Sequence, residues 1–310
     1  MNSQGLIFFF SLFISSFFLV FSSNDWFFVW MGLEINMFSF MLIISNNSGM
    51  EVESCLKYFF IQSLGSGILM LSFYSQISMI NYINGLILSY KMGTGPFYFW
   101  FPSLCEGISW ISCYLLMTIQ KIIPLMLMSL SSSEILWFII VSSLIVGAFG
   151  SMNQVKLKRL MAYSSIHHIG WLVLCMMLSI SIWWMYLIMY MFMILGVLIL
   201  FSKNEVLVIN FIMKGYESWM FILMMMSMGG IPPMLGFFLK WWIFYYLPLS
   251  SMYMYLCMLL MSVVMIYIYM RIIYNLLLGE VNMMSLNLIF YDKFKFTMKD
   301  MVYIMGMFLG

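Results

Sequence analysis

The 310-residue sequence has very few charged residues. Asp, Glu, Lys and Arg make up 8% of it, whereas soluble domains carry about 25%. Hydrophobic residues make up 65%, and a water-soluble core cannot absorb that much apolar surface, so the bilayer must be the solvent. The net charge of +2 is too small to predict a nucleic-acid or acidic-substrate partner. The composition therefore excludes a soluble domain and predicts a polytopic membrane protein.

The N-terminus lacks the features of a cleaved targeting segment. The first residues, MNSQGLIFFFSLF, contain no basic residue and no obvious cleavage site. Signal peptides begin with a basic region, and transit peptides are rich in arginine. We therefore expect a retained first span.

Cysteine pairs and nucleotide motifs are also missing. The five cysteines form no CxxC pair, so disulfides, zinc and iron–sulfur ligation are not expected. There is no P-loop, and GTG at 93–95 lacks the third glycine of a dinucleotide fingerprint. His167 and His168 are adjacent and cannot form an i,i+4 metal pair. No cofactor is expected in this chain. If the chain belongs to an energy-converting machine, the energy enters through another subunit.

Ten apolar stretches are long enough to cross a membrane. A span needs about 20 residues, and lipid forces it to be helical. A polar segment and a short, partial or interfacial helix are expected in 278–310. All belong to one transmembrane domain, whose expected spans are 4–22, 26–44, 57–75, 79–101, 109–130, 134–151, 159–179, 181–201, 218–246 and 252–277.

Basic residues fall only in alternate loops. By the positive-inside rule, such residues mark one side of the membrane. An even number of spans puts the N-terminus on that side, which is the matrix in a mitochondrial inner membrane. The residues that mark it are Lys57, Lys156, Lys158, Arg159, Lys203, Lys214, Lys293, Lys295 and Lys299, with Arg271 near the membrane edge.

Four charged residues remain within the spans, and Glu106 lies at a span edge. Each central charge costs about 2.5–3.5 kcal/mol, so four cost on the order of 10 kcal/mol. Snorkelling to the interface suits Lys57 and also fits one of the four, Lys240. It does not suit the others, and a functional polar path is favoured over a structural ion pair. The four residues are Glu34, Lys91, Lys121 and Lys240.

Proline and glycine interrupt the three spans that carry these lysines. The motifs are KMGTGPFYFW at 91–100, TIQKIIP at 118–124 and GGIPPMLGFFLKW at 229–241. A proline frees the carbonyl four residues before it, here those of Met92, Gln120, Met228 and Gly229. Broken helices are tolerated at membrane depth only inside protein or beside a wet cavity. We expect freed carbonyls and water to solvate the ammonium groups, and an incidental proline kink is the alternative.

The spacing of the interrupted spans predicts an internal repeat. The fourth and ninth spans are five apart, and an odd offset inverts a duplicated unit, as in many transporters. The halves would be approximately 1–130 and 134–277. The counterpart of Glu34 would lie in the seventh span, which contains His167 and His168. These histidines titrate near neutral pH and suit a proton relay, and neutral packing between helices is the alternative.

Six ordered motifs resemble the antiporter-like subunit family of mitochondrial NADH–ubiquinone oxidoreductase, respiratory complex I. The animal form of the subunit 2 family is most similar. The resemblance covers approximately residues 24–277. The motifs are WMGLEINMFSF, CLKYFFIQSLGS, KMGTGPFYFWFPSLCEG, TIQKIIPLM, LKRLMAYSSIHHIGW and GGIPPMLGFFLKW.

This resemblance implies a fold like that of cation/proton antiporters and a role for each intramembrane charge. Glu34 matches the glutamate that pairs with the lysine of the first broken helix, Lys91. Lys121 matches the central lysine of the proton path, and Lys240 matches the lysine of the second broken helix. Tyr98 stands where the family commonly has histidine, so any role of that histidine is in doubt here.

The family also implies partners and redox groups outside this chain. His168 aligns with the usual histidine, and His167 is additional. FMN, iron–sulfur clusters and ubiquinone are expected in other subunits of the respiratory chain enzyme. Neighbouring antiporter-like subunits and anionic lipid such as cardiolipin are expected as partners. Three bacterial-type N-terminal spans would be absent, so a subunit or lipid should cover that flank.

Three functions remain open from the sequence. The favoured one is proton translocation as a membrane subunit of complex I, coupled to electron transport elsewhere. An independent cation/proton antiporter is the second, although such proteins usually bind the cation through buried Asp or Glu. A structural complex I subunit without its own proton flux is the third.

Overall fold

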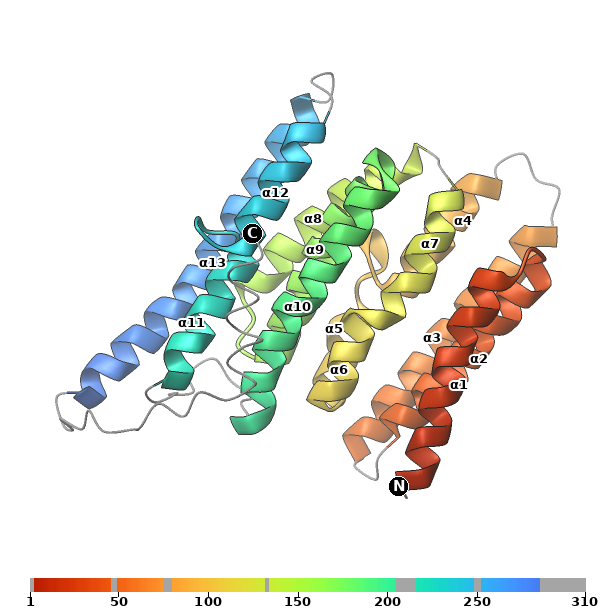
Figure 1. Cartoon of the computed structure of the whole chain (residues 1–310), viewed down its shortest axis with the longest axis horizontal. Helices are drawn as coiled ribbons and strands as arrows, with labels where there is room; N and C mark the ends of the chain where they lie inside the picture. The colour runs from red at the N-terminus through yellow and green to blue at the C-terminus, as the bar shows by residue number, and fades with distance from the viewer. Residues whose placement is uncertain are drawn as a thin grey trace.

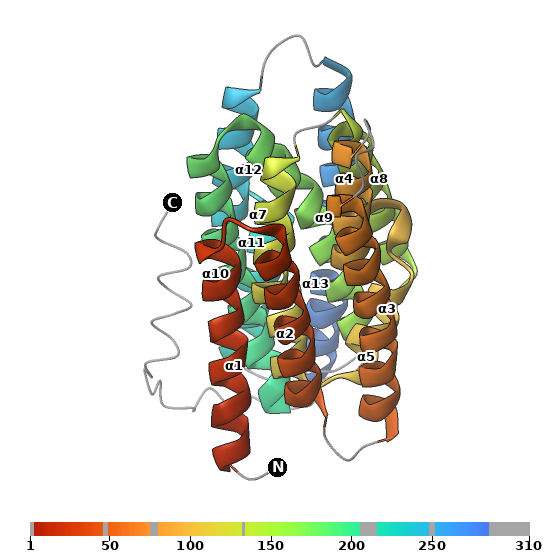
Figure 2. The ribbon, with the colours of Figure 1, turned by 90° about the vertical axis from the view of Figure 1, so that its right-hand side faces the viewer.

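A computed structural model describes residues 3–45, 49–74, 80–131, 134–204, 216–247 and 252–284. Within these ranges, every regular element is a helix. The helices form a bundle whose members run roughly along one direction (Figure 1 and Figure 2). A helix satisfies its own backbone hydrogen bonds, which lipid cannot do. The all-α membrane fold predicted from composition is therefore confirmed.

The ten expected spans correspond to seven single helices and three divided ones. The single helices are α1 (Ser3–Ser22), α2 (Trp26–Ile44), α3 (Gly49–Tyr74), α8 (Ile135–Met152), α9 (Leu157–Leu178), α10 (Ile180–Asn204) and α13 (Met252–Met284). The divided ones are α4 (Ile80–Met92) with η1 (Gly95–Phe97) and α5 (Trp100–Gly107), α6 (Trp110–Met117) with η2 (Ile119–Lys121) and α7 (Ile122–Leu130), and α11 (Tyr216–Gly229) with α12 (Leu235–Tyr246). By length and apolar composition, seven stretches of the described residues qualify as membrane spans.

The last described helix, α13, ends later than the expected tenth span. Helix α13 continues to Met284, seven residues beyond the expected end of the span at 277. The rest of the expected polar segment and the short final helix lie outside the described residues. So do Lys214, the side chain of Lys203 and the three lysines of the tail.

Each lysine-bearing span is divided where the proline and glycine motifs predict. Gly93 and Gly95 have φ angles of +67° and +57°, which only glycine adopts at low cost. Gly230, with φ +78°, makes the corresponding turn between α11 and α12. The α6–α7 break has no glycine and turns at Thr118 (φ −119°, ψ −78°). Pro124 lies in the first turn of α7, where its missing N–H costs nothing. These are breaks between separate helices and not kinks within one helix.

Helix α9 occupies the centre of the bundle. It packs between α8 and α10, while α1–α3 and α11–α13 lie toward opposite ends of the row (Figure 1). Its most apolar stretch is 89% buried. Gly147 of α8 lies against the backbone of His167, because a Cβ at Gly147 would sit 2.6 Å from the His167 nitrogen. Small residues let membrane helices approach this closely, and here the contact fixes the two histidines at mid-bundle.

Candidate functional site

All three intramembrane lysines are enclosed by protein. The exposed fractions of Lys91, Lys121 and Lys240 are 5%, 3% and 6%. A snorkelling lysine would have an exposed head, so the snorkelling interpretation of Lys240 is wrong. Lys57 behaves as that interpretation requires, because its side chain is 47% exposed and pairs with Glu53 at 2.6 Å. The costly charges therefore face the interior of the bundle and not the lipid.

Helix α3 holds Glu34 and Lys91 in position. The Ser66 hydroxyl donates a hydrogen bond to the Glu34 carboxylate. Gly65 makes room for the stem of Lys91, since a Cβ there would lie 2.9 Å from Lys91 Cγ. The Gln62 amide donates to the Lys91 carbonyl at 2.9 Å, at the broken end of α4. The motif CLKYFFIQSLGS thus supplies three supports for one glutamate–lysine pair.

The charges of Glu34 and Lys91 interact without a direct contact. Glu34 exerts a charge interaction on the Lys91 ammonium. The three ion pairs within 4.0 Å that the described residues form involve other side chains. The hydroxyl of Ser66 is therefore the direct partner of the carboxylate. A pair held apart in this way has room to tighten or loosen.

A polar cavity separates Lys91 from Lys121. Its volume is about 30 Å³, which is room for about two water molecules. Asn36 and Gln120 also line it. Asn36 Oδ1, Gln120 Nε2 and Lys121 Nζ are buried and have no hydrogen-bond partner among the described residues. Because unpaired buried polar atoms are costly, this cavity strongly favours water, and Phe101 supports the Lys121 ammonium from 4.8 Å by a cation–π contact.

The two histidines lie between the second and third lysines. Both Lys121 and Lys240 exert charge interactions on His168. His167 accepts a hydrogen bond at Nε2 from the Trp171 indole at 3.1 Å. The Trp171 ring in turn lies 6.0 Å from the Lys240 ammonium. The hydrogen bond suits a neutral, packed imidazole, and the position between two lysines suits a relay.

At the second broken helix, a freed carbonyl binds the lysine as expected. The Lys240 ammonium donates to the Gly229 carbonyl at 2.8 Å, and Pro233 lacks the N–H that would otherwise occupy this carbonyl. Gly230 permits the close approach, since a Cβ there would lie 3.0 Å from Lys240 Nζ. The first break differs, because side chains of Gln62 and Trp100 donate to the carbonyls that end α4.

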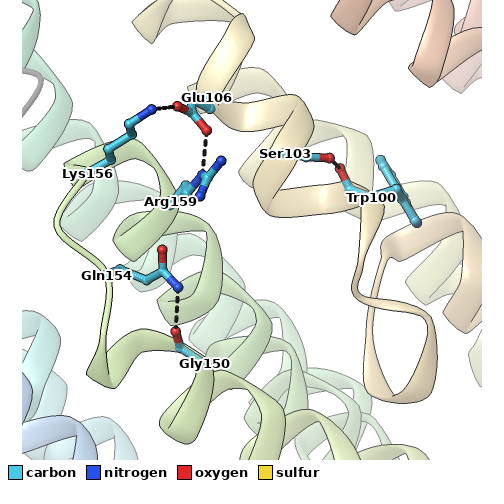
Figure 3. Close-up of polar contacts among 7 residues, drawn as sticks. All are labelled: Trp100, Ser103, Glu106, Gly150, Gln154, Lys156 and Arg159. Atoms are coloured by element: carbon cyan, nitrogen blue, oxygen red, sulfur yellow. Dashed lines mark hydrogen bonds and ion pairs between the residues drawn. The ribbon is translucent and has the colours of Figure 1, made fainter.

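Glu106, predicted at a span edge, belongs to an ion cluster at the end of α5. Its carboxylate accepts hydrogen bonds from Lys156 and Arg159 (Figure 3). Partial burial would raise the pKa of this carboxyl, but the two hydrogen bonds outweigh burial and lower the pKa below its ordinary value. Lys158 donates to the nearby Ile108 carbonyl at 2.5 Å. The cluster joins the connection before the fifth expected span to the connection before the seventh, and the charge pattern assigned both to one side of the membrane.

Sequence reasoning missed the polar residues that surround the charges. Their only signal is that they are amides, hydroxyls or glycines inside apolar spans, spaced by about one helical turn as Gln62 and Ser66 are. That pattern identifies one helix face, but it does not show which residue of another helix this face contacts. The missed residues are Asn36, Gln62, Gly65, Ser66 and Gln120.

Metal ligation finds no support in the part of the chain that the structure describes. No three His, Cys, Asp or Glu side chains cluster there to hold an ion. All five cysteines are free thiols. The ionisable side chains that the structure brings together inside the bundle are three buried lysines, one glutamate and two histidines.

A family model and several named proteins match this chain. The family model, described as NADH:quinone oxidoreductase/Mrp antiporter, TM, matches residues 23–87 and 74–268. A protein named NADH-ubiquinone oxidoreductase chain 2 from Anopheles gambiae is 35% identical over 277 residues, covering 82% of this chain and 81% of that protein. The protein of the same name from Locusta migratoria is 36% identical, covering 88% and 85%.

Solved structures share the fold. A chain of respiratory complex I from Thermus thermophilus superposes with a TM-score of 0.72 at 21% identity, covering 83% of this chain and 67% of that one. A chain of the Mrp complex from a Dietzia species gives 0.71 at 14%, covering 86% and 58%. Together with the family model and the insect relatives, these likenesses establish that the chain belongs to the NADH:quinone oxidoreductase/Mrp antiporter family of multi-pass membrane subunits, in the NADH-ubiquinone oxidoreductase chain 2 branch.

Proposed function

We propose that this chain is a proton-translocating core subunit of mitochondrial complex I in the inner membrane, acting as part of NADH:ubiquinone reductase. The observation that carries the proposal is one row of ionisable groups inside the bundle, all buried except the partly exposed Glu34, with a polar cavity between Lys91 and Lys121. Such residues are expensive at membrane depth and mark ion or proton pathways. The row runs through Glu34, Lys91, Lys121, His168 and Lys240.

Proton movement would follow from changes in the charge pairing along this row. Quinone reduction in other subunits would tighten or loosen Glu34 against Lys91. A change of charge at Lys91 alters the field at Lys121 across the cavity, which in low dielectric is a strong interaction. Lys121 would then exchange its proton with Lys240 through the histidines, with His168 as the first relay and His167 as the second.

The two halves of the chain, approximately 1–130 and 134–277, would be inverted copies that meet along this row. A broken helix in each half supports this proposal, namely α4–α5 and α11–α12. Each places a lysine beside its break. Inverted repeats with interrupted helices put the transported ion near the membrane midplane.

Partners would include the neighbouring antiporter-like subunits, with FMN, iron–sulfur clusters and ubiquinone held elsewhere in the complex. Helix α1 presents an apolar outer face that a subunit or lipid would cover, with Ile7 and Phe18 about 70% exposed. Anionic lipid such as cardiolipin would bind near the basic residues that surround Glu106. No nucleic acid is involved.

The test compares Lys121→Ala with Lys57→Ala in the assembled complex, reconstituted in liposomes. We expect Lys121→Ala to lower the number of protons moved per NADH oxidised while assembly persists, and Lys57→Ala to leave it unchanged. An unchanged stoichiometry in Lys121→Ala would favour a structural subunit. Sodium-driven proton exchange by the isolated chain would favour an independent antiporter.

A further inference from the structure

A cluster of buried hydroxyl groups lies beside His168, apart from the row of lysines. Its tyrosines come from α10 and α13, and its serines from α9, one turn before the histidine. Each of these side chains is at most 2% exposed. This hydroxyl cluster consists of Ser164, Ser165, Tyr186, Tyr190 and Tyr269.

The cluster is in contact with His168 and with itself. The Tyr186 hydroxyl and His168 Nδ1 are hydrogen-bonded at 2.8 Å, and the Tyr190 ring lies 5.0 Å from the imidazole. The Tyr190 hydroxyl lies beside Ser165, and that of Tyr269 lies beside Ser164. Tyr190 and Tyr269 are also near enough to interact electrostatically.

Several of these polar atoms are left without partners. The hydroxyls of Tyr190 and Tyr269 and Nε2 of His168 are buried and make no hydrogen bond of good geometry within the described residues. The neighbouring serines donate to their own helix, Ser164 to the Met161 carbonyl and Ser165 to the Ala162 carbonyl. An unpaired buried hydroxyl is destabilising. At a position that serves only packing, we therefore expect either a tyrosine whose hydroxyl is hydrogen-bonded or a phenylalanine.

The cluster extends from mid-bundle toward the basic end. Ser164 and Ser165 are one turn closer than His168 to the start of α9, where Lys156 and Arg159 hold Glu106 (Figure 3). On α13, Arg271 follows Tyr269 by two residues and donates to the Met152 carbonyl at the end of α8, at 2.7 Å. The hydroxyl cluster therefore lies between the relay histidine and the side of the membrane that the basic loops mark.

We propose that the hydroxyl cluster is a proton branch that connects His168 with the basic side of the membrane, with Tyr190 and Tyr269 as its transferring groups. Each hydroxyl accepts one proton on its oxygen and releases its own to the next group, so no group changes its charge overall. Water between the unpaired atoms completes the chain. This inference rests on the proposed function and adds the route by which protons reach the row of lysines.

If the hydroxyl cluster has only a structural role, replacing its tyrosines by phenylalanine should not slow proton transfer. Tyr→Phe at Tyr190 and Tyr269 removes only an oxygen that makes no hydrogen bond of good geometry within the described residues. The substitution should therefore keep or increase stability, so a loss of proton transfer cannot be attributed to unfolding. Tyr255 provides a matched control, because its hydroxyl donates to the carbonyls of Phe244 and Leu247 at 3.0 and 2.6 Å, outside the cluster.

The experiment measures proton uptake per NADH oxidised by the assembled complex in liposomes, together with its thermal stability and its rate in D₂O. We expect the double variant Tyr190→Phe/Tyr269→Phe to assemble normally and to slow proton uptake about 100-fold, the lower end of the range for losing a positioned proton-transfer group, with a changed solvent isotope effect. Tyr255→Phe should leave proton uptake unchanged.

Normal proton uptake in the double variant would overturn the proposed branch. If Lys121→Ala still lowers proton uptake in the same assay, the proposed function stands and only the branch is wrong. If neither variant changes proton uptake, both proposals are wrong. Loss of uptake in Tyr255→Phe to the same extent would also overturn the branch, because the effect would not be specific to the cluster.

Discussion

Two glycines on different faces of α3 test whether this helix positions Lys91. Gly65 and Gly67 are two residues apart on α3, and replacing each by alanine adds one methyl group. At Gly67 nothing lies within 4 Å of the new methyl. Alanine is favoured over glycine inside a helix by about 0.5–1 kcal/mol, so Gly67→Ala should be slightly stabilising.

At Gly65 the same methyl meets the stem of Lys91. It would lie 2.9 Å from Cγ and 3.0 Å from Cε of that lysine, closer than ordinary carbon contacts of about 3.5–4.0 Å. The stem must therefore move by roughly half an ångström or more, and such overpacking costs about 1–3 kcal/mol. After the gain in helix propensity, Gly65→Ala should range from near neutral to about 2.5 kcal/mol destabilising.

The larger effect should be on proton transfer. A displaced Lys91 no longer has its present distance to Glu34 or to the cavity, and a misplacement of about 1 Å can lower a rate on the order of 100-fold. We expect Gly65→Ala to assemble and to oxidise NADH while moving fewer protons per NADH in liposomes. Gly67→Ala should match the unmodified protein.

The two variants also give a result that would refute the reasoning. If Gly65→Ala and Gly67→Ala have the same thermal stability and the same proton yield, the close contact between α3 and Lys91 does not exist. A loss of assembly in Gly67→Ala would show instead that the outer face of α3 is a subunit contact.

Three further predictions concern single residues. Lys121→Met should stabilise the protein by about 0.5–1.5 kcal/mol, because burying the charge costs about 2.5–3.5 kcal/mol and the desolvated Phe101 contact offsets about 2 kcal/mol of that cost. Thermal denaturation measures this change, and a destabilised variant would show that the ammonium has a strong partner. Gly93→Ala should destabilise the fold by about 1–2 kcal/mol because of the positive φ at this position, and the added methyl would also lie only 2.8 Å from Phe101 Cβ. The yield of assembled complex should therefore fall. Gly49→Ala, whose methyl would have nothing within 4 Å, should assemble normally. The carboxyl of Glu106 has a pKa below its ordinary 4.5. Its ion cluster therefore stabilises the protein above that pH, and this stabilisation is lost as the pH falls through the lowered pKa. Glu106→Gln should be less stable at neutral pH and should show a weaker dependence of stability on acid pH, and identical stability–pH profiles would contradict this.

Much of the fold could be predicted because each feature depends on local chemistry. Apolar runs near 20 residues gave the span positions, since only helices that satisfy their own backbone are stable in lipid. Pro96, Pro124 and Pro233 located the three breaks, because a missing N–H acts on the carbonyl four residues earlier. The binding of Lys240 by the Gly229 carbonyl follows from the same rule.

The candidate site was predictable only in its charged members. Glu34, Lys91, Lys121 and Lys240 are conspicuous because charges are costly in lipid wherever they lie. The polar residues around them carry no such signal, since a serine or glutamine in a span can face lipid, bond to its own helix or contact a neighbour. Lys240 shows the limit for the charges themselves, because its position near a span end fitted snorkelling until the bundle placed it inside.

The sequence by itself determined that the chain is helical, approximately where its spans lie and where they break, and which ionisable groups enter the membrane. Only the tertiary structure decided that Ser66 binds Glu34, that Gly65 accommodates Lys91 and that a polar cavity separates Lys91 from Lys121. The physical reason lies in the solvent. In water, the apolar stripe of a helix identifies its buried face, but in a bilayer the lipid-facing side is as apolar as the packed side. The rotation and pairing of helices are then set by close contacts between small and polar side chains on different helices, which one helix's hydrophobic pattern does not encode.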